Sequence, residues 1–502
     1  MKPFAFTTLL ALFPASAWAG TPTFKALPDA LPVEHVYSGG WEHFVGGGVA
    51  VFDCNGDMRP DVAAAGGTEP ARLFVNETEG ETIRFSEGNL PDMRETTGLY
   101  PLDIDGDEHL DLVVLRVGPN LLLKGDGACG FTDNSAAWGF DGGDAWSTAF
   151  SATWEEGRDL PTLAIGNYVD RNNPKGPFGT CDTNALYRAE DDRYAPPAPI
   201  APGWCALSML ISDWQRSGTP ELRISNDRHY YVRGGYEEMW RLDPLAPRTE
   251  ADGWAKVSLW GMGIASADIT GDGLPEVMLT SMGDQLLQFN LGDSWSNAPY
   301  DVGAAAQRPY QGDDGRPSTG WHAEFGDVDN DGRLDLFIAK GNVDQMPSNA
   351  MKDPNNLLMQ TPDGRFEEAG GPAGIADDAR SRGAALADFD RDGRLDMVVS
   401  ARRAPLRIWR NETDAGNWLA VEPHMAAPNS RAVGAWVEVR TTSGTQAREI
   451  TVGGGHAGGQ AGPIHFGLGG AETADMRVIW PDGSADAWQH VKANRVLRPR
   501  QK

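Results

Sequence analysis

Short apolar runs recur along the chain, and many of them follow a compact polar loop. The most complete example is the nine-residue loop 327–335, which begins at Asp327 and leads directly into Leu336-Phe337-Ile338-Ala339. A short apolar run bounded by turn residues is typical of a buried strand. The pattern therefore predicts a unit in which a polar loop connects two strands of one sheet.

This unit recurs seven times. First positions of the loops fall at residues 53, 103, 154, 213, 268, 327 and 388. Such a period, with several short strands per repeat, is typical of a propeller or a solenoid, and seven units of about four strands would close into a ring. Small residues lie five positions before six loops and suit inner strands crowded around an axis: Gly48, Gly98, Ala149, Ser208, Gly263 and Gly383.

Five of the loops carry oxygen ligands at positions 1, 3, 5 and 9. Carboxylates this close together repel one another unless a hard cation lies among them, and calcium accepts six to eight oxygen ligands. An EF-hand would need a glutamate at position 12, where the loop at Asp327 has Ile338. We therefore expect about five structural calcium ions. The predicted ligands are Asp53, Asn55, Asp57 and Asp61; Asp103, Asp105, Asp107 and Asp111; Asp268, Thr270, Asp272 and Glu276; Asp327, Asp329, Asp331 and Asp335; and Asp388, Asp390, Asp392 and Asp396.

Two units keep the frame but lose the ligands, and we do not expect them to bind calcium. Their positions 1, 3, 5 and 9 are Trp154, Glu156, Arg158 and Thr162 in one, and Asp213, Gln215, Ser217 and Glu221 in the other.

The pattern changes after residue 413. Residues 433–439 and 476–480 alternate between apolar and polar positions, which predicts strands of a small antiparallel β domain. We expect this module to pack on the propeller without completing a blade. Two motifs mark it, Ile464-His465-Phe466-Gly467-Leu468-Gly469 and Trp480-Pro481-Asp482-Gly483.

The loops resemble the FG-GAP/VCBS repeats of integrin-like propellers, and these two motifs resemble the ASPIC/UnbV module. Together with the lead Glu34-His35-Val36-Tyr37, the pairing resembles the cartilage acidic protein family, in a bacterial-type secreted member. The resemblance implies an all-β chain: a seven-bladed integrin-like β-propeller with calcium loops, followed by a small antiparallel β domain. We divide the chain into a signal peptide (1–19), an N-terminal lead (20–41), the propeller (42–413) and the ASPIC/UnbV-like domain (414–502).

The N-terminus reads as a secretory signal, with Lys2, an apolar run and the small-residue site Ala17-Trp18-Ala19. We expect cleavage after Ala19 and a secreted or periplasmic protein. No other stretch approaches the roughly 20 apolar residues of a membrane span, so no membrane insertion is expected. The net charge of −28 argues against binding nucleic acid.

Four cysteines are present: Cys54, Cys129, Cys181 and Cys205. An even number in an oxidising compartment favours two disulfides, although free buried thiols are an alternative and three pairings are possible. We favour Cys181–Cys205, because both lie in one Pro-rich excursion, which leaves Cys54 to pair with Cys129.

No nucleophile elbow, P-loop, zinc-protease or dinucleotide motif occurs, and no catalytic residue is assigned. We expect a monomeric calcium-binding propeller that binds a protein or a glycan. The alternative is a lyase- or dehydratase-like enzyme acting on a carbohydrate or small polar substrate at the channel mouth. His322, which replaces the small residue of its unit, and His43 are the possible channel ligands.

Overall fold

The structure is a computed structural model that describes residues 21–174, 179–227, 234–305, 307–312 and 315–502. The predicted signal peptide, residues 1–19, lies outside this range. The described chain is all-β, as predicted, with three short 3-10 helices: η1 (Trp41–His43), η2 (Glu250–Asp252) and η3 (Tyr300–Val302). Within the described residues no helix has the length and apolarity needed to span a bilayer.

Seven sheets of four or five strands follow one another along the described chain. The first three sheets comprise β2 (Val49–Phe52), β3 (Asp61–Ala64), β4 (Arg72–Asn76) and β5 (Phe85–Glu87); β6 (Thr96–Leu102), β7 (Asp111–Arg116), β8 (Leu121–Gly125) and β9 (Phe131–Asp133); and β10 (Ser147–Thr153), β11 (Thr162–Asn167), β12 (Asn184–Tyr187) and β15 (Ala198–Ile200). A small hairpin, β13 (Ala189–Glu190) and β14 (Arg193–Tyr194), projects from the third.

The remaining four sheets repeat this order. They comprise β16 (Ala206–Ser212), β17 (Glu221–Asn226), β18 (Glu238–Arg241) and β19 (Ala246–Pro247); β20 (Gly261–Ala267), β21 (Glu276–Ser281), β22 (Leu286–Asn290) and β23 (Trp295–Asn297); β24 (Gly320–Gly326), β25 (Asp335–Lys340), β26 (Asn356–Gln360) and β27 (Phe366–Glu368); and β28 (Arg380–Ala387), β29 (Asp396–Arg402), β30 (Ala404–Asn411) and β1 (Phe24–Ala26).

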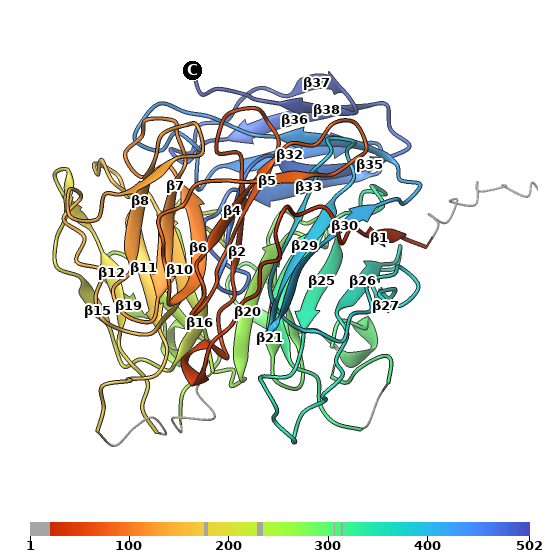
Figure 1. The fold of residues 1–502 in the computed structure, drawn as a ribbon. Helices are drawn as coiled ribbons and strands as arrows, with labels where there is room; N and C mark the ends of the chain where they lie inside the picture. Colours follow the sequence, from red (N-terminus) through yellow and green to blue (C-terminus); the bar gives the residue numbers. More distant parts are fainter. Residues whose placement is uncertain (1–20, 175–178, 228–233, 306, 313–314) are drawn as a thin grey trace, which may run out of the picture.

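The arrangement is propeller-like (Figure 1). The first strand of each sheet lies beside the first strand of the next, and β28 of the last sheet lies beside β2 of the first. In each unit the predicted polar loop connects this first strand to the second. Apolar clusters fill the spaces between neighbouring sheets, so each sheet is buried against both neighbours.

The N-terminal lead contributes a strand to the last sheet. Strand β1 pairs with β30 in antiparallel register, with Phe24 opposite Asn411 and Ala26 opposite Trp409. Because β1 and β30 come from opposite ends of the seven units, this pairing fastens the first described residues to the last sheet.

The C-terminal module lies over one end of the sheets (Figure 1). Its two sheets contain β31 (Asn417–Val421), β35 (Ile464–Gly469) and β38 (Arg495–Leu497), and β32 (Trp436–Thr441), β33 (Gly444–Glu449), β36 (Thr473–Ile479) and β37 (Gln489–Lys492). They enclose a core of their own. The module is not purely antiparallel as predicted, because β31 and β38 run parallel.

A glycine-rich loop of the module, residues 452–459, enters the centre of the ring. Its backbone bonds to inner strands of several sheets: Gly454 N–H donates to Met209 O at 2.7 Å, and Gly455 N–H donates to Ile264 O at 2.6 Å. The following strand β34 (Gln460–Ala461) pairs with β2 as a fifth strand of the first sheet. The module thus does more than pack on the sheets, since part of it lies among them.

This loop explains why small residues precede the polar loops. A Cβ atom on Gly48 would lie 1.7 Å from the carbonyl oxygen of Ala457, and a Cβ on Gly98 would lie 2.3 Å from the same atom. Both distances are far below van der Waals contact, so the first two inner strands leave room for the loop only by having glycine at this position.

Most tryptophans pack inside this architecture. Trp146, Trp240 and Trp254, which lie in the part of the sequence with the weakest calcium loops, are all buried. They therefore serve packing between elements and do not form an exposed aromatic platform.

The fit of the glycine-rich loop predicts that Gly48→Ala destabilises the protein by about 1–3 kcal/mol, since the added methyl group overlaps the Ala457 carbonyl. Gly462→Ala is the control, because Gly462 follows the same loop and has no heavy atom within 4 Å of its Cβ position. Urea unfolding should show a change below about 0.5 kcal/mol for the control. Equal stabilities of the two variants would contradict the placement of the loop.

Candidate metal centres

The five acidic loops share one backbone conformation. Positions 4 and 6 have positive φ angles in every loop, including residues that are not glycine, such as Met58 (68°), Glu108 (71°) and Arg391 (62°). Left-handed backbone at two positions curls the loop back on itself and is costly outside glycine. The loop at Asp213 shares this conformation, with Arg216 at 52° and Gly218 at 78°, so the conformation belongs to the repeat and the acidic side chains are what distinguish the five loops.

Carboxylates at the two ends of each loop hold this conformation. In the loop at Asp327, the position-1 carboxylate accepts the N–H groups of Asp331 at 3.0 Å and Gly332 at 2.7 Å. The position-9 carboxylate, Asp335, accepts Val328 N–H at 3.0 Å and reaches the third strand through Gln360 N–H at 2.9 Å. Position 9 therefore joins the loop to the second and third strands of its sheet.

Within three of the loops the carboxylates converge enough to share a cation. Potential ligand atoms lie within 4.8 Å of one another in the sets Asp103, Asp105 and Asp111; Asp327, Asp329 and Asp335; and Asp388, Asp390 and Asp396. In the other two loops position 3 is Asn55 or Thr270, which supply an amide or hydroxyl oxygen in place of a carboxylate.

Burial makes these carboxylates hard to ionise without a cation. Desolvation raises the pKa of Asp111 to about 8, that of Asp388 to about 7 and that of Asp61 to about 7. Burial, followed by repulsion from neighbouring carboxylates, raises the pKa of Asp327 and Asp335 well above its usual range. A bound divalent cation would relieve both effects.

In two of the loops, one oxygen of a ligand carboxylate pairs with a basic side chain, whereas its other oxygen is buried and available to a cation. Lys124 Nζ lies 2.9 Å from Asp107 Oδ2 and also contacts Asp105 Oδ2, and Arg410 Nε lies 2.7 Å from Asp390 Oδ2. The other oxygens, Asp105 Oδ1 and Asp390 Oδ1, are buried and have no hydrogen-bond partner among the described residues. An all-oxygen donor set with unsatisfied carboxylate oxygens suits calcium.

In the two units without the acidic pattern, arginine side chains neutralise the carboxylates. Arg248 Nε lies 2.7 Å from Glu221 Oε2, and its Nη2 lies 3.3 Å from Gln215 Oε1, so the guanidinium joins positions 9 and 3 of the loop at Asp213. In the loop at Trp154, Arg158 and Arg188 both pair with Glu155. That neither loop binds calcium remains a prediction.

The structure separates the two histidines proposed as channel ligands. His322 lies on β24, and its Nδ1 accepts the N–H of His456 at 3.2 Å. His43 lies on η1, with its Nε2 3.3 Å from Glu95. His456, at the tip of the glycine-rich loop, is a buried residue that sequence reasoning missed; the flanking glycines in Gly453-Gly454-Gly455-His456-Ala457-Gly458-Gly459 were the available signal.

Both favoured disulfides are present. Cys54 pairs with Cys129 and joins the first acidic loop to the second sheet, and Cys181 pairs with Cys205. The sulfur atoms of the first pair lie within 4.8 Å of an Asp61 carboxylate oxygen, but a sulfur held in a disulfide has no thiolate with which to bind a metal ion.

Comparison with known proteins matches both parts of the chain. The model of the FG-GAP-like repeat matches residues 53–114, 268–338 and 327–399, and the model described as ASPIC and UnbV matches residues 425–502. Cartilage acidic protein 1 of Mus musculus is 33% identical over 162 residues, as is that of Homo sapiens. The chain therefore has FG-GAP-like repeats and an ASPIC and UnbV domain, and it is similar to cartilage acidic protein 1 over part of its length.

These family matches coincide with the acidic loops. The FG-GAP-like segments contain all five predicted calcium loops and leave out the units at Trp154 and Asp213. The match to the mouse family member covers 31% of this chain and 25% of that protein, so the two are similar over only part of their lengths. Among solved structures, the BP39L lectin from Burkholderia pseudomallei has a TM-score of 0.45 and 13% identity, covering 74% of this chain and 97% of the lectin.

The raised pKa values predict that the affinity for calcium decreases as the pH is lowered. Below its pKa of about 8, Asp111 carries a proton that calcium must displace, and the same holds for Asp61 and Asp388 below about 7. Between pH 8.5 and pH 6 we expect the affinity to fall by up to about tenfold per pH unit for each displaced proton. Calorimetric calcium titrations at constant ionic strength measure this. Identical isotherms at both pH values would contradict it.

Proposed function

We propose that the protein is a secreted or periplasmic, calcium-stabilised, seven-bladed β-propeller that acts as a monomer and binds a protein or glycan partner. The observation that carries this proposal is the convergence of carboxylates in three acidic loops, together with two further loops that have the same backbone conformation and oxygen-bearing residues at the same positions. The first strands of the seven sheets succeed one another around the axis and return to the start, as the blades of a propeller do. The two disulfides favour an oxidising compartment.

The filled axis argues for binding over catalysis. The enzyme alternative needs an open channel in which His322 meets other ionisable groups and a substrate. In the described structure, His322 Nε2 lies 3.3 Å from Glu324 Oε2, and the inserted segment covers this pair. The N–H of His456 donates to His322 Nδ1, Gln460 Nε2 donates to Glu324 Oε1 at 2.7 Å, and the His456 ring packs against Trp321 at 5.0 Å. Burial lowers the pKa of His456 to about 3, so this histidine is neutral at physiological pH.

The opposite end of the axis is also closed. An apolar cluster that includes Trp146, Leu207 and Trp321 packs around the first residues of several inner strands. Helix η1 covers it and is held there by Arg402, which contacts His43 O and donates to Gly40 O at 3.2 Å. The described residues therefore leave the periphery of the sheets as the place for a ligand.

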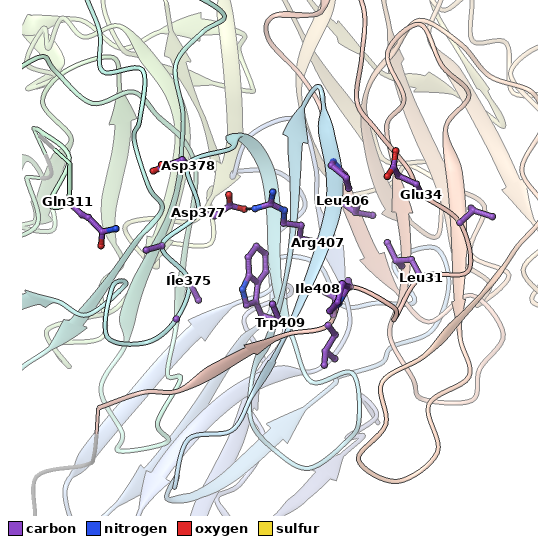
Figure 2. Close-up of a pocket in the computed structure, with 17 residues that line it drawn as sticks. Leu31, Glu34, Gln311, Ile375, Asp377, Asp378, Leu406, Arg407, Ile408 and Trp409 are labelled. Atoms are coloured by element: carbon purple, nitrogen blue, oxygen red, sulfur yellow. Dashed lines mark ion pairs between the residues drawn. The ribbon is translucent and has the colours of Figure 1, made fainter. Parts of the chain in front are cut away.

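One groove on that periphery has the size of a ligand site. It has a volume of about 650 Å³ and lies between the lead, the segment after β27 and strand β30. Figure 2 shows Trp409 and Ile408 on its floor, with Leu31 on one side and the Arg407–Asp377 ion pair across it. Ligand sites of about 300–1,000 Å³ typically combine apolar walls with a few polar groups.

These features suit a sugar ring or a short peptide. Each offers an apolar face to an aromatic floor and polar groups to a charged pair at the rim. The rim also carries the exposed Glu34 and Gln311, which add hydrogen-bonding capacity without closing the groove.

Calcium removal should lower the melting temperature. An ion at 100 times its Kd adds about 2.7 kcal/mol to the folded state, so several ions are a large part of a total stability of about 5–15 kcal/mol. Thermal unfolding followed by circular dichroism, with calcium and with a chelator, measures the difference. Superimposable melting curves would end the structural role proposed for calcium.

The groove predicts a residue-specific loss of binding. Arg407→Ala removes the charged group at its rim and should weaken a partner found on a glycan or peptide array by about tenfold or more. Arg365→Ala is the matched control, because Arg365 forms a similar surface pair with Asp363 at 3.5 Å, away from the groove. If both variants bind as the unmodified protein does, the ligand site lies elsewhere.

A further inference from the structure

The C-terminal module contacts several of the acidic loops directly. We propose, on the basis of the calcium sites proposed above, that calcium in the loops at Asp103, Asp327 and Asp388 holds the module on the sheets and keeps its glycine-rich loop in the central channel. The module would then be the calcium-dependent partner of the propeller within the same chain.

The module reaches the loop at Asp103 through a polar contact. The hydroxyl of Ser430 donates to Asp103 Oδ2, one of the position-1 ligand oxygens. Beside it, Arg431 Nη2 donates to Glu108 O at 3.0 Å, and Arg500 lies 3.3 Å from the Glu108 carboxylate. Both the ligand and the left-handed position 6 of this loop are thus bound by the module.

The loop at Asp327 is covered more closely. A Cβ atom on Gly467 would lie 1.9 Å from Asp327 Oδ2, so the backbone of β35 rests directly against a ligand carboxylate. Main-chain bonds fix the contact: Gly416 N–H donates to Asp329 O at 2.9 Å, and Gly469 N–H donates to Asn330 O at 2.7 Å. These bonds form only while the loop keeps its present shape.

The loop at Asp388 is bound at position 6. The carbonyl oxygen of Gly393 accepts from His465 Nε2 at 3.1 Å and from Asn330 Nδ2 at 2.9 Å. A Cβ on Gly393 would lie 1.8 Å from the Trp418 ring, so this side chain also rests on the loop. The loops at Asp327 and Asp388 are therefore bonded both to each other and to the module.

The strands that touch these loops are the ones that flank the glycine-rich loop. It connects β33 to β35 through β34. On the β35 side, His465 and Gly467 lie on the acidic loops. On the β33 side, Glu449 accepts Asp213 N–H at 2.8 Å and Ser212 Oγ–H at 2.5 Å, in a unit without the acidic ligands. One end of the inserted segment is thus fixed on calcium loops and the other on a loop held without calcium.

Linkage gives the direction of the effect. Without a cation, the carboxylates of a covered loop repel one another, and a change in loop shape breaks the bonds to β35. Since the docked module requires the calcium-bound shape of the loop, calcium must in turn favour the docked module. The first acidic loop offers a contrast, because the module pairs with the preceding strand at Phe52 and makes no described hydrogen bond to the loop itself. The described hydrogen bonds of residues 53–61 stay within the first two sheets, and no heavy atom lies within 4 Å of a Cβ on Gly56.

Hydrogen exchange in the full-length protein tests the inference. The amides of Gly454, Gly455 and His456 report on the inserted loop, because each donates to an inner strand. With calcium at about 100 times its Kd, we expect their exchange to be up to ~100-fold slower than with a chelator. Amides within the core of the module should change little, which separates release of the loop from unfolding.

Two matched variants locate the effect. Asp331 and Asp57 both occupy position 5, and each accepts the N–H of an arginine two residues later, at 2.9 and 2.8 Å. With calcium present, Asp331→Asn should accelerate exchange at Gly455 by about tenfold or more, whereas Asp57→Asn should leave it unchanged. Each should lower the calcium affinity of its own loop, measured by calorimetry.

The outcomes separate this inference from the proposed function. If calcium binds and both variants leave exchange at the inserted loop unchanged, the module is not held by calcium and the inference fails alone. If both variants accelerate exchange equally, the effect is one of general stability and the inference also fails. If calorimetry detects no calcium binding to the unmodified protein, the calcium sites themselves are wrong, and the inference falls with them.

Discussion

The fold depends on how charge is compensated at the turn between the first two strands of each sheet. The carboxylate at position 9 of the loop at Asp327 is buried and accepts hydrogen bonds from backbone N–H groups on both sides. It therefore organises the sheet, but burial makes its ionisation unfavourable. A cation must supply what burial removes. In five units we assign that cation to calcium, alongside basic side chains such as Lys124 and Arg410. In the unit at Asp213, Arg248 pairs with the position-9 carboxylate, and in the unit at Trp154 position 9 is the uncharged Thr162.

Local patterns account for what the sequence predicts well. The acidic loops, the following strands and the period between units depend on residues close together in the chain, as does the pairing of Cys181 with Cys205. The glycine-rich loop could not be predicted in this way, because its partners on β16, β20 and β24 lie far away in the sequence. A glycine-rich segment without periodic apolar residues is usually interpreted as a surface linker, whereas this one occupies a narrow channel.

The same limit applies to the strand that fastens the ring and to the role of His322. Nothing in Phe24–Ala26 identifies β30 as its partner, since the pairing spans almost the whole propeller. His322 stood out as the one large residue in a column of small ones. In the structure its partners are the N–H of His456, from a distant part of the chain, and Glu324 on its own strand, so an unusual residue in an otherwise regular column indicated an internal contact.

Filling the axis moves the search for function to the outside of the molecule, where the groove beside β30 lies, and it makes the acidic loops the central chemical feature. The assignment of these loops as calcium sites is tested most directly by elemental analysis of the purified full-length protein after dialysis to equilibrium against buffer with calcium at millimolar concentration, from which the calcium content of the dialysis buffer is subtracted. The account predicts about five bound calcium ions per chain. Fewer than about two bound ions per chain would contradict it.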